Sequence, residues 1–215
     1  MATITLPDVA SNDDDVQPLP RLDADANGLL MSPEEFDAID DWDNGYRYEL
    51  IRGVVIVNPL PFEAQGDPNE ELGHLLRNHH EDHPQGARLD KTMAERYVSI
   101  PSGTRRQPDR ALWCGLGRLP KPKSDVPSII VELVSRRRRD WRRDYIDKRR
   151  EYASIGVPEY WVFDRFRRTL TVFLLDGTER IVAENEAYES PLLPGFVFPL
   201  RRLLELTDAW ERQES

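Results

Sequence analysis

The segment 129–134 is the most apolar short run in the chain, and it contains one acidic residue, Glu132. A run of branched apolar residues of this length is typical of a β-strand that is buried on both faces. A carboxylate inside such a strand is costly unless it is paired, hydrogen-bonded or bound to a metal. The sequence therefore predicts a partner for Glu132, and Asp109 and Lys148 are the candidates.

Strand and helix signals alternate along the chain, which predicts a mixed α/β sheet in one domain. Ser32 and Glu35 form a capping box that begins a short helix. A hairpin is expected at 46–57, with its turn at Arg52-Gly53. Longer helices are expected at about 69–83 and 140–155. Further strands are expected at 97–100, 109–113, 129–134, 159–164, 169–175 and 179–184.

The helix expected at 140–155 carries a lysine on its apolar face. The apolar positions of that face are Trp141, Tyr145, Tyr152 and Ile155. Lys148 stands where the next apolar residue of this stripe belongs. A lysine on a packed face needs an anionic partner, either Glu132 or, one turn earlier, Asp144. The alternative is that its stem packs while its ammonium group reaches water.

The acidic residues are concentrated at the start of the chain. The formal net charge is −10, but residues 1–43 hold 12 of the 39 acidic residues and one base, so the remainder is near neutral. We interpret residues 1–28 as a disordered acidic segment and 29–215 as the folded domain. The single cysteine, Cys114, fits a reducing cytoplasm and is interpreted as a packed side chain. Signal-peptide and membrane-spanning patterns were not found, so we expect a cytoplasmic protein without a membrane partner.

Two carboxylates and a lysine are the groups that metal-assisted hydrolysis of a phosphodiester needs. Asp109 and Glu132 would supply hard oxygen ligands of the kind that Mg²⁺ prefers. Such a metal polarises the phosphate and lowers the pKa of a bound water. Lys148 would orient that water or stabilise charge that develops on the phosphoryl oxygens.

Several segments, in this order and spacing, resemble the Uma-two family, a branch of the PD-(D/E)XK nuclease superfamily of restriction-endonuclease-like proteins. The segments are 48–53, Pro108-Asp109, 131–135, Asp144 with Lys148, and 152–164. The resemblance covers about residues 30–206. It implies a restriction-endonuclease-like core, in which a mixed central β-sheet is flanked by α-helices and the active site lies at one edge.

The resemblance also implies roles for individual residues. Asp109, Glu132 and the backbone carbonyl of Leu133 would bind Mg²⁺, with Mn²⁺ as an alternative. The superfamily pattern places its lysine two residues after the second acid, where this chain has Val134. The Uma-two branch takes the lysine from the following helix, and Lys148 fits that position.

Glu49 matches an upstream glutamate of the family. By that resemblance it would complete the catalytic site or hold the hairpin. The alternative is a solvated strand residue with no part in catalysis.

An arginine run follows the predicted Glu132 strand, where the family usually has a short polar turn. The basic residues expected to contact nucleic acid are Arg136, Arg137, Arg138, Arg139, Arg142 and Arg143. Beside a nuclease site they are interpreted as contacts to the phosphate backbone of DNA. The alternative is a solvated helix face with ion pairs.

The resulting prediction is a Mg²⁺-dependent DNA endonuclease that acts, by resemblance, as a homodimer. One alternative is a catalytically weak nucleic-acid-binding or regulatory module of the same fold, in which the acidic residues 1–43 cover the arginine run. Another is a metal-dependent phosphohydrolase that acts on RNA or nucleotides, for which the same carboxylates would serve.

Overall fold

The computed structural model describes residues 20–134 and 142–213, and these form two β-sheets with helices packed against them. The larger sheet has six strands in the order β10-β9-β8-β7-β6-β3, and the smaller has four in the order β2-β1-β5-β4. Strands β7 and β8 are parallel, whereas the other pairings of the large sheet are antiparallel. The predicted mixed α/β architecture is therefore confirmed.

The described elements have the following bounds. The strands are β1 (Tyr46–Ile51), β2 (Val54–Pro59), β3 (Leu89–Ala94), β4 (Val98–Ile100), β5 (Thr104–Arg106), β6 (Arg110–Cys114), β7 (Ile129–Leu133), β8 (Glu159–Asp164), β9 (Thr169–Leu174) and β10 (Glu179–Ala183). The α-helices are α1 (Pro33–Ala38), α2 (Glu63–Asp82), α4 (Lys148–Ser154) and α5 (Leu200–Gln213). A π-helical turn, η3 (Arg143–Asp147), leads into α4, and short 3₁₀ helices lie at η1 (Ala24–Ala26) and η2 (Gly86–Arg88).

Strand β7 lies inside the large sheet, and its two faces pack into different apolar clusters. Ile129, Val131 and Leu133 belong to the core beneath α2 and α5. Ile130 and Val134 belong to a second cluster that includes the tyrosines of η3 and α4. Because side chains alternate along a strand, Glu132 projects toward the same side as Ile130, the side of α4. Burial on both faces agrees with the prediction made from the apolar run.

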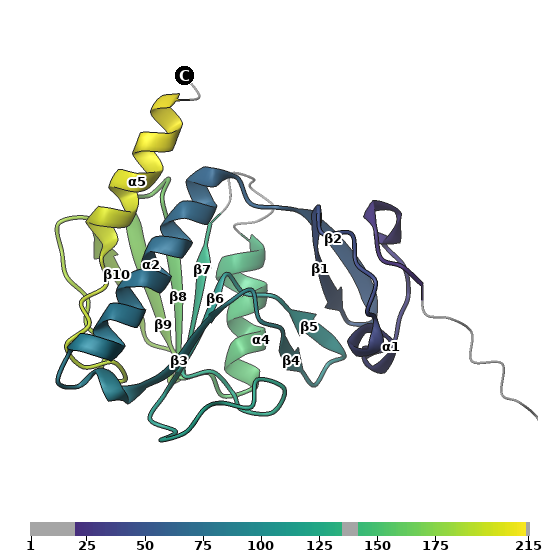
Figure 1. Cartoon of the computed structure of the whole chain (residues 1–215), viewed down its shortest axis with the longest axis horizontal. Coiled ribbons are helices and arrows are strands. Elements are labelled where there is room, and N and C mark those ends of the chain that lie inside the picture. The colour runs from purple at the N-terminus through teal and green to yellow at the C-terminus, as the bar shows by residue number, and fades with distance from the viewer. Residues whose placement is uncertain (1–19, 135–141, 214–215) are drawn as a thin grey trace, which may run out of the picture.

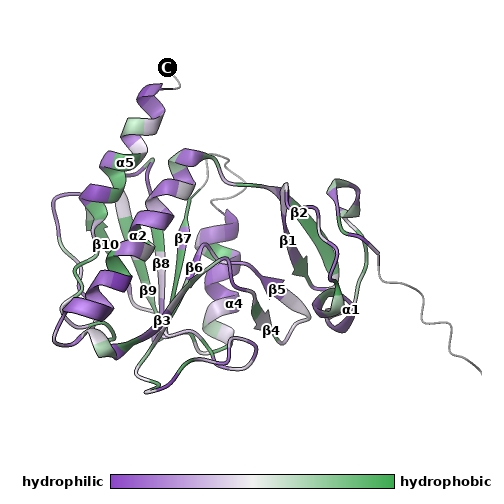
Figure 2. Cartoon of the chain, in the orientation of Figure 1, coloured by the Kyte–Doolittle hydropathy of each residue, from purple (hydrophilic) through white to green (hydrophobic). Residues whose placement is uncertain are grey.

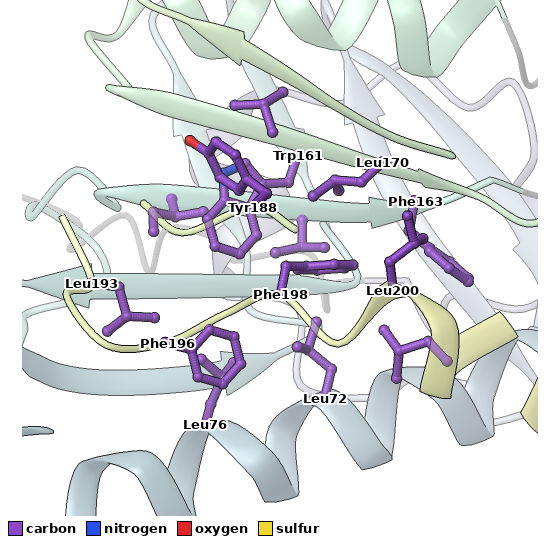
Figure 3. Packing of buried hydrophobic residues seen from close by; sticks show 14 of the residues in the cluster. Leu72, Leu76, Trp161, Phe163, Leu170, Tyr188, Leu193, Phe196, Phe198 and Leu200 are labelled. Carbon is purple, nitrogen blue, oxygen red and sulfur yellow. The ribbon is translucent and has the colours of Figure 1, made fainter. Parts of the chain in front are cut away.

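Apolar side chains fill the space between the large sheet and the helices α2 and α5. Figure 1 shows the two helices side by side along the large sheet, with β1 and β2 set apart from it beside α1. In Figure 3, Leu72 and Leu76 point from α2 toward Phe198 and Phe196. Figure 2 shows mainly apolar strands in the large sheet, whereas α2 and α4 also carry polar residues on their outer sides. None of the helices within the described ranges is long and apolar enough to cross a bilayer.

Helix α2 begins six residues before the predicted start at 69, and Pro68 therefore lies inside the helix. A proline inside a helix lacks the N–H that would bond to the carbonyl four residues earlier. Here that carbonyl belongs to Ala64, and the Thr207 hydroxyl of α5 lies 3.4 Å from it. The contact from α5 therefore lies at a carbonyl that the proline leaves without its helical donor.

Residues 20–28 hold defined positions, although the sequence predicted that disorder extends to residue 28. Leu22 is fully buried, its N–H donates to the Asp41 carbonyl, and the Tyr48 hydroxyl donates to the Leu22 carbonyl. The prediction was wrong for this stretch, since the acidic residues around Leu22 concealed one buried anchor. Residues 1–19 lie outside the described part of the chain, so their disorder stays a prediction.

Candidate active site

The ends of β6 and β7 bring Asp109 and Glu132 together. The strands are antiparallel with Arg110 opposite Val131, and continuing this register by one residue places Asp109 opposite Glu132. Opposite residues of antiparallel strands lie about 4.5 to 5.5 Å apart at their Cα atoms. The Leu133 N–H also donates to Asp109 Oδ2 over 2.7 Å, which fixes that carboxylate against the end of β7.

Lys148 meets Glu132 from the first turn of α4. Its Nζ lies 2.7 Å from Glu132 Oε1 and 3.5 Å from Asp144 Oδ1. The Tyr152 hydroxyl donates to the same Glu132 Oε1 over 3.0 Å. Lys148 is only 3% exposed, so its ammonium group does not reach water as the alternative interpretation required. The structure therefore brings together the lysine and the glutamate that the sequence singled out.

A π-helical turn places the lysine. Residues 143–147 form η3, and α4 begins at Lys148 itself. Such wide turns occur mostly as single turns within helices, frequently at functional sites. Asp144 and Tyr145 are buried on this turn and Tyr152 is buried on α4, which agrees with the predicted stripe. Trp141, the first residue of that stripe, lies outside the described residues.

Burial and neighbouring charges together shift the pKa values of this cluster. Burial, assisted by the charges of Asp109 and Asp144, raises the pKa of Glu132 to about 7 although Lys148 acts to lower it. Burial also raises the pKa of Asp144. For Lys148 burial acts to lower the pKa, but Glu132, Asp144 and Glu49 outweigh it, so the pKa is raised. The ammonium group therefore stays charged.

Glu49 is buried in an ionic link between the small sheet and α4. Its carboxylate accepts from the Arg106 guanidinium at 3.2 Å and from the Gln107 N–H at 3.1 Å. Arg106 also pairs with Glu151 of α4 at 2.6 Å. Burial acts to raise the pKa of Glu49, but Lys148 and Arg106 outweigh it and lower the pKa. The alternative of a solvated strand residue does not fit this environment.

Three polar side chains that the sequence reasoning did not select also contact the site. Gln65 of α2 donates to the Leu133 carbonyl over 2.7 Å, and Asn69 donates to the Asp109 carbonyl over 3.0 Å. Arg47 of β1 donates to Asp109 Oδ1 over 2.9 Å. For Arg47 a signal existed, because residues two apart on a strand share a face and Glu49 had been selected. Gln65 lay before the helix start that we had predicted.

The arginines predicted to contact DNA are only partly within the described residues. Arg136, Arg137, Arg138 and Arg139 lie outside them. Arg142 is exposed, and the Arg143 Nε donates to Asp144 Oδ1 over 3.1 Å.

Cys114 has no part in this site, since burial, assisted by Asp90, raises its pKa to about 12 and keeps the thiol protonated.

The carboxylate and carbonyl oxygens of the site suit a hard divalent cation that takes few ligands from the protein. Across residues 20–134 and 142–213, no group of three or more His, Cys, Asp and Glu side chains is arranged to hold a metal. Mg²⁺ needs only one or two carboxylates because it keeps several of its waters. Asp109 and Glu132, with the Leu133 carbonyl beside them, provide such oxygens.

Comparison with known proteins places the chain in a family. The family model Uma2, described as "Putative restriction endonuclease", matches residues 33–201. The chain belongs to the Uma2 family. A solved structure with the same fold is a "putative nuclease belonging to DUF820" from Anabaena variabilis, with a TM-score of 0.64 and 13% sequence identity. The match covers 82% of this Uma2 chain and 99% of that one. A search of curated proteins found no match.

Proposed function

We propose that this member of the endonuclease family hydrolyses phosphodiester bonds of DNA with Mg²⁺, for which Mn²⁺ can substitute. The observation that carries the proposal is the meeting of Asp109, Glu132 and Lys148 at one end of β6 and β7. Two carboxylates and a buried, charged lysine are not needed for stability at this position, because a well-packed apolar group is often at least as stable as a buried ion pair.

Asp109, Glu132 and the Leu133 carbonyl would hold the metal. When bound there, Mg²⁺ polarises the phosphate and lowers the pKa of a bound water. The Leu133 N–H orients the Asp109 carboxylate, and Tyr152 orients the Glu132 carboxylate through Oε1. Such fixed ligands reduce the reorganisation that accompanies the reaction.

Lys148 supplies the positive charge for the chemical step. Its raised pKa keeps the ammonium group protonated at neutral pH. In that state it donates hydrogen bonds to the attacking water or to a phosphoryl oxygen and stabilises the negative charge that develops there. Glu49 acts at longer range, through its ionic contact with Arg106 and its charge near Lys148.

Cleavage of supercoiled plasmid DNA with Mg²⁺ or Mn²⁺ tests the proposal. We expect Glu132→Gln and Lys148→Met each to lower the cleavage rate by about 10²-fold or more, because each removes a group that acts in the transition state. Glu159→Gln is the matched control. Glu159 is an equally buried glutamate of the adjacent strand β8, and it is bonded instead to Trp161, Tyr188 and Ser190.

Equal rates for the wild type and the two site variants would overturn the proposal. DNA binding without cleavage under any divalent metal would favour the catalytically weak binding module instead. Cleavage of RNA with DNA left intact would identify the other phosphohydrolase. Sedimentation with and without DNA tests the homodimer.

A further inference from the structure

A guanidinium group already occupies the outer oxygen of Asp109. Asp109 has two carboxylate oxygens, and the Leu133 N–H holds Oδ2. Arg47 NH1 donates to the other, Oδ1, over 2.9 Å. Arg47 therefore places its positive charge on a carboxylate that the proposed metal also needs. Two cations at one carboxylate oxygen repel each other, so the metal and this contact compete.

The remaining contacts of Arg47 leave it able to exchange partners. Its NH2 pairs with Glu95, whose side chain is 43% exposed at the rim of the site. Among the residues that the structure describes, its buried Nε has no hydrogen-bond partner. An unsatisfied buried donor in a native structure requires an explanation, such as a group that is bound during function. Glu95 also has a left-handed backbone, with φ of 52°, and such strained residues cluster at functional sites.

We propose that Arg47 is a phosphate-contacting residue of the nuclease, held on Asp109 until metal and substrate bind. The inference rests on the proposed function. With a metal held by the Asp109 carboxylate, the guanidinium would release Oδ1 and donate to a phosphoryl oxygen of the DNA backbone. The planar guanidinium suits paired contacts with phosphate oxygens, and its Nε and the adjacent NH2 form such a pair once NH2 leaves the exposed Glu95. No covalent bond changes in this step.

The competing interpretation is that Arg47 only ties the two sheets together. It comes from β1 of the small sheet, whereas Asp109 and Glu95 flank strands of the large sheet. A tie of this kind would influence stability and nothing else. A substitution that frees Asp109 therefore separates the two interpretations, provided that metal binding is measured without DNA.

The experiment measures the Mn²⁺ affinity of the DNA-free protein by electron paramagnetic resonance. We expect Arg47→Gln to bind Mn²⁺ at least about fivefold more tightly than the wild type, because the competing cation is gone. Arg105→Gln is the control, since that arginine also lies in the small sheet and its side chain is equally exposed, at 13%. Arg105 makes its paired contact with Asp37 of α1 and should leave the affinity unchanged.

Cleavage at saturating Mn²⁺ provides the second measurement. We expect Arg47→Gln to lower kcat by about 10²-fold despite its tighter metal binding. Arg47→Lys keeps the charge but loses the paired geometry, so it should bind Mn²⁺ much like the wild type and still lose kcat. This second variant keeps the test valid if the glutamine variant unfolds.

Weaker or unchanged Mn²⁺ affinity in Arg47→Gln, or an unchanged kcat in both variants, would overturn the role of Arg47. Failure of the proposed function looks different, because Glu132→Gln would then bind Mn²⁺ as well as the wild type does. If neither the wild type nor Arg47→Gln binds Mn²⁺, both proposals are overturned.

Discussion

At the scale of single residues, the buried pair of Glu132 and Lys148 links stability to pH. Glu132 releases its proton at a pKa of about 7 in the folded chain, above its ordinary value of 4.5. Its ionisation therefore opposes folding. The contribution of this carboxyl to the free energy of unfolding is largest below about pH 4.5 and falls as the pH rises toward 7. Lys148 limits that loss, because its charge acts to lower the pKa of Glu132.

Removing the lysine should reveal this linkage. We expect Lys148→Met to lower the free energy of unfolding by about 3 to 5 kcal/mol at pH 8, since Glu132 and Asp144 then lack their buried cation. At pH 5.5 the loss should be smaller, because Glu132 takes up a proton. Urea denaturation at both pH values measures the difference. Lys91→Met, on an exposed position of β3, is the control, and an equal loss at the two pH values would contradict the prediction.

At the scale of elements, two glycines of α2 differ in what lies beside them. A Cβ at Gly73 would come within 2.6 Å of the Arg110 guanidinium, which Asn69 holds with two hydrogen bonds. A Cβ at Gly66 would meet no atom within 4 Å. We expect Gly66→Ala to raise the free energy of unfolding by about 0.5 to 1 kcal/mol through its better helix propensity. Gly73→Ala should lower it by about 1 to 3 kcal/mol through overpacking. Thermal unfolding measures the stability of both variants against the wild type. The prediction fails if Gly73→Ala is as stabilising as Gly66→Ala.

Local patterns predicted the elements better than they predicted the contacts of the site. The capping box of α1, the turn at Arg52-Gly53 and the apolar strand β7 are all present. Each depends on residues close in sequence. The stripe that included Lys148 located the lysine correctly, although a π-helical turn precedes it. The contacts from Arg47 and Gln65 depend on how the two sheets and α2 meet, and the shared strand face of Arg47 and Glu49 was the only local hint of them.

At the scale of the whole molecule, the acidic residues of the segment 1–43 fall into two groups, one before residue 20 and one within the described structure. Of the 12 acidic residues in 1–43, only four lie in 1–19, and the other eight belong to the described structure. The same segment supplies Leu22, Phe36 and Ile39 to the core of the small sheet. Residues 1–43 therefore do not act as one detachable polyanion, although the charge count had suggested it.

Two truncations test this division. We expect a chain that lacks residues 1–43 to unfold at least about 10 °C below the full chain, because several buried apolar side chains are lost. A chain that lacks residues 1–19 keeps that core and is the correct subject for the hypothesis that acidic residues exclude DNA. If the hypothesis holds, its DNA affinity rises at low salt. An unchanged melting temperature after removal of residues 1–43 would contradict the first expectation.

The register between β6 and β7 has a consequence for how the sheet assembles. A slip of one residue between paired strands turns every side chain to the opposite face. Such a slip would send Glu132 into the leucine and phenylalanine core beneath α2, away from Lys148 and Tyr152. An ionised carboxylate buried without a partner costs several kcal/mol, so that misfolded sheet is strongly disfavoured. An acid inside the most apolar strand thus selects a single pairing of the central strands during folding.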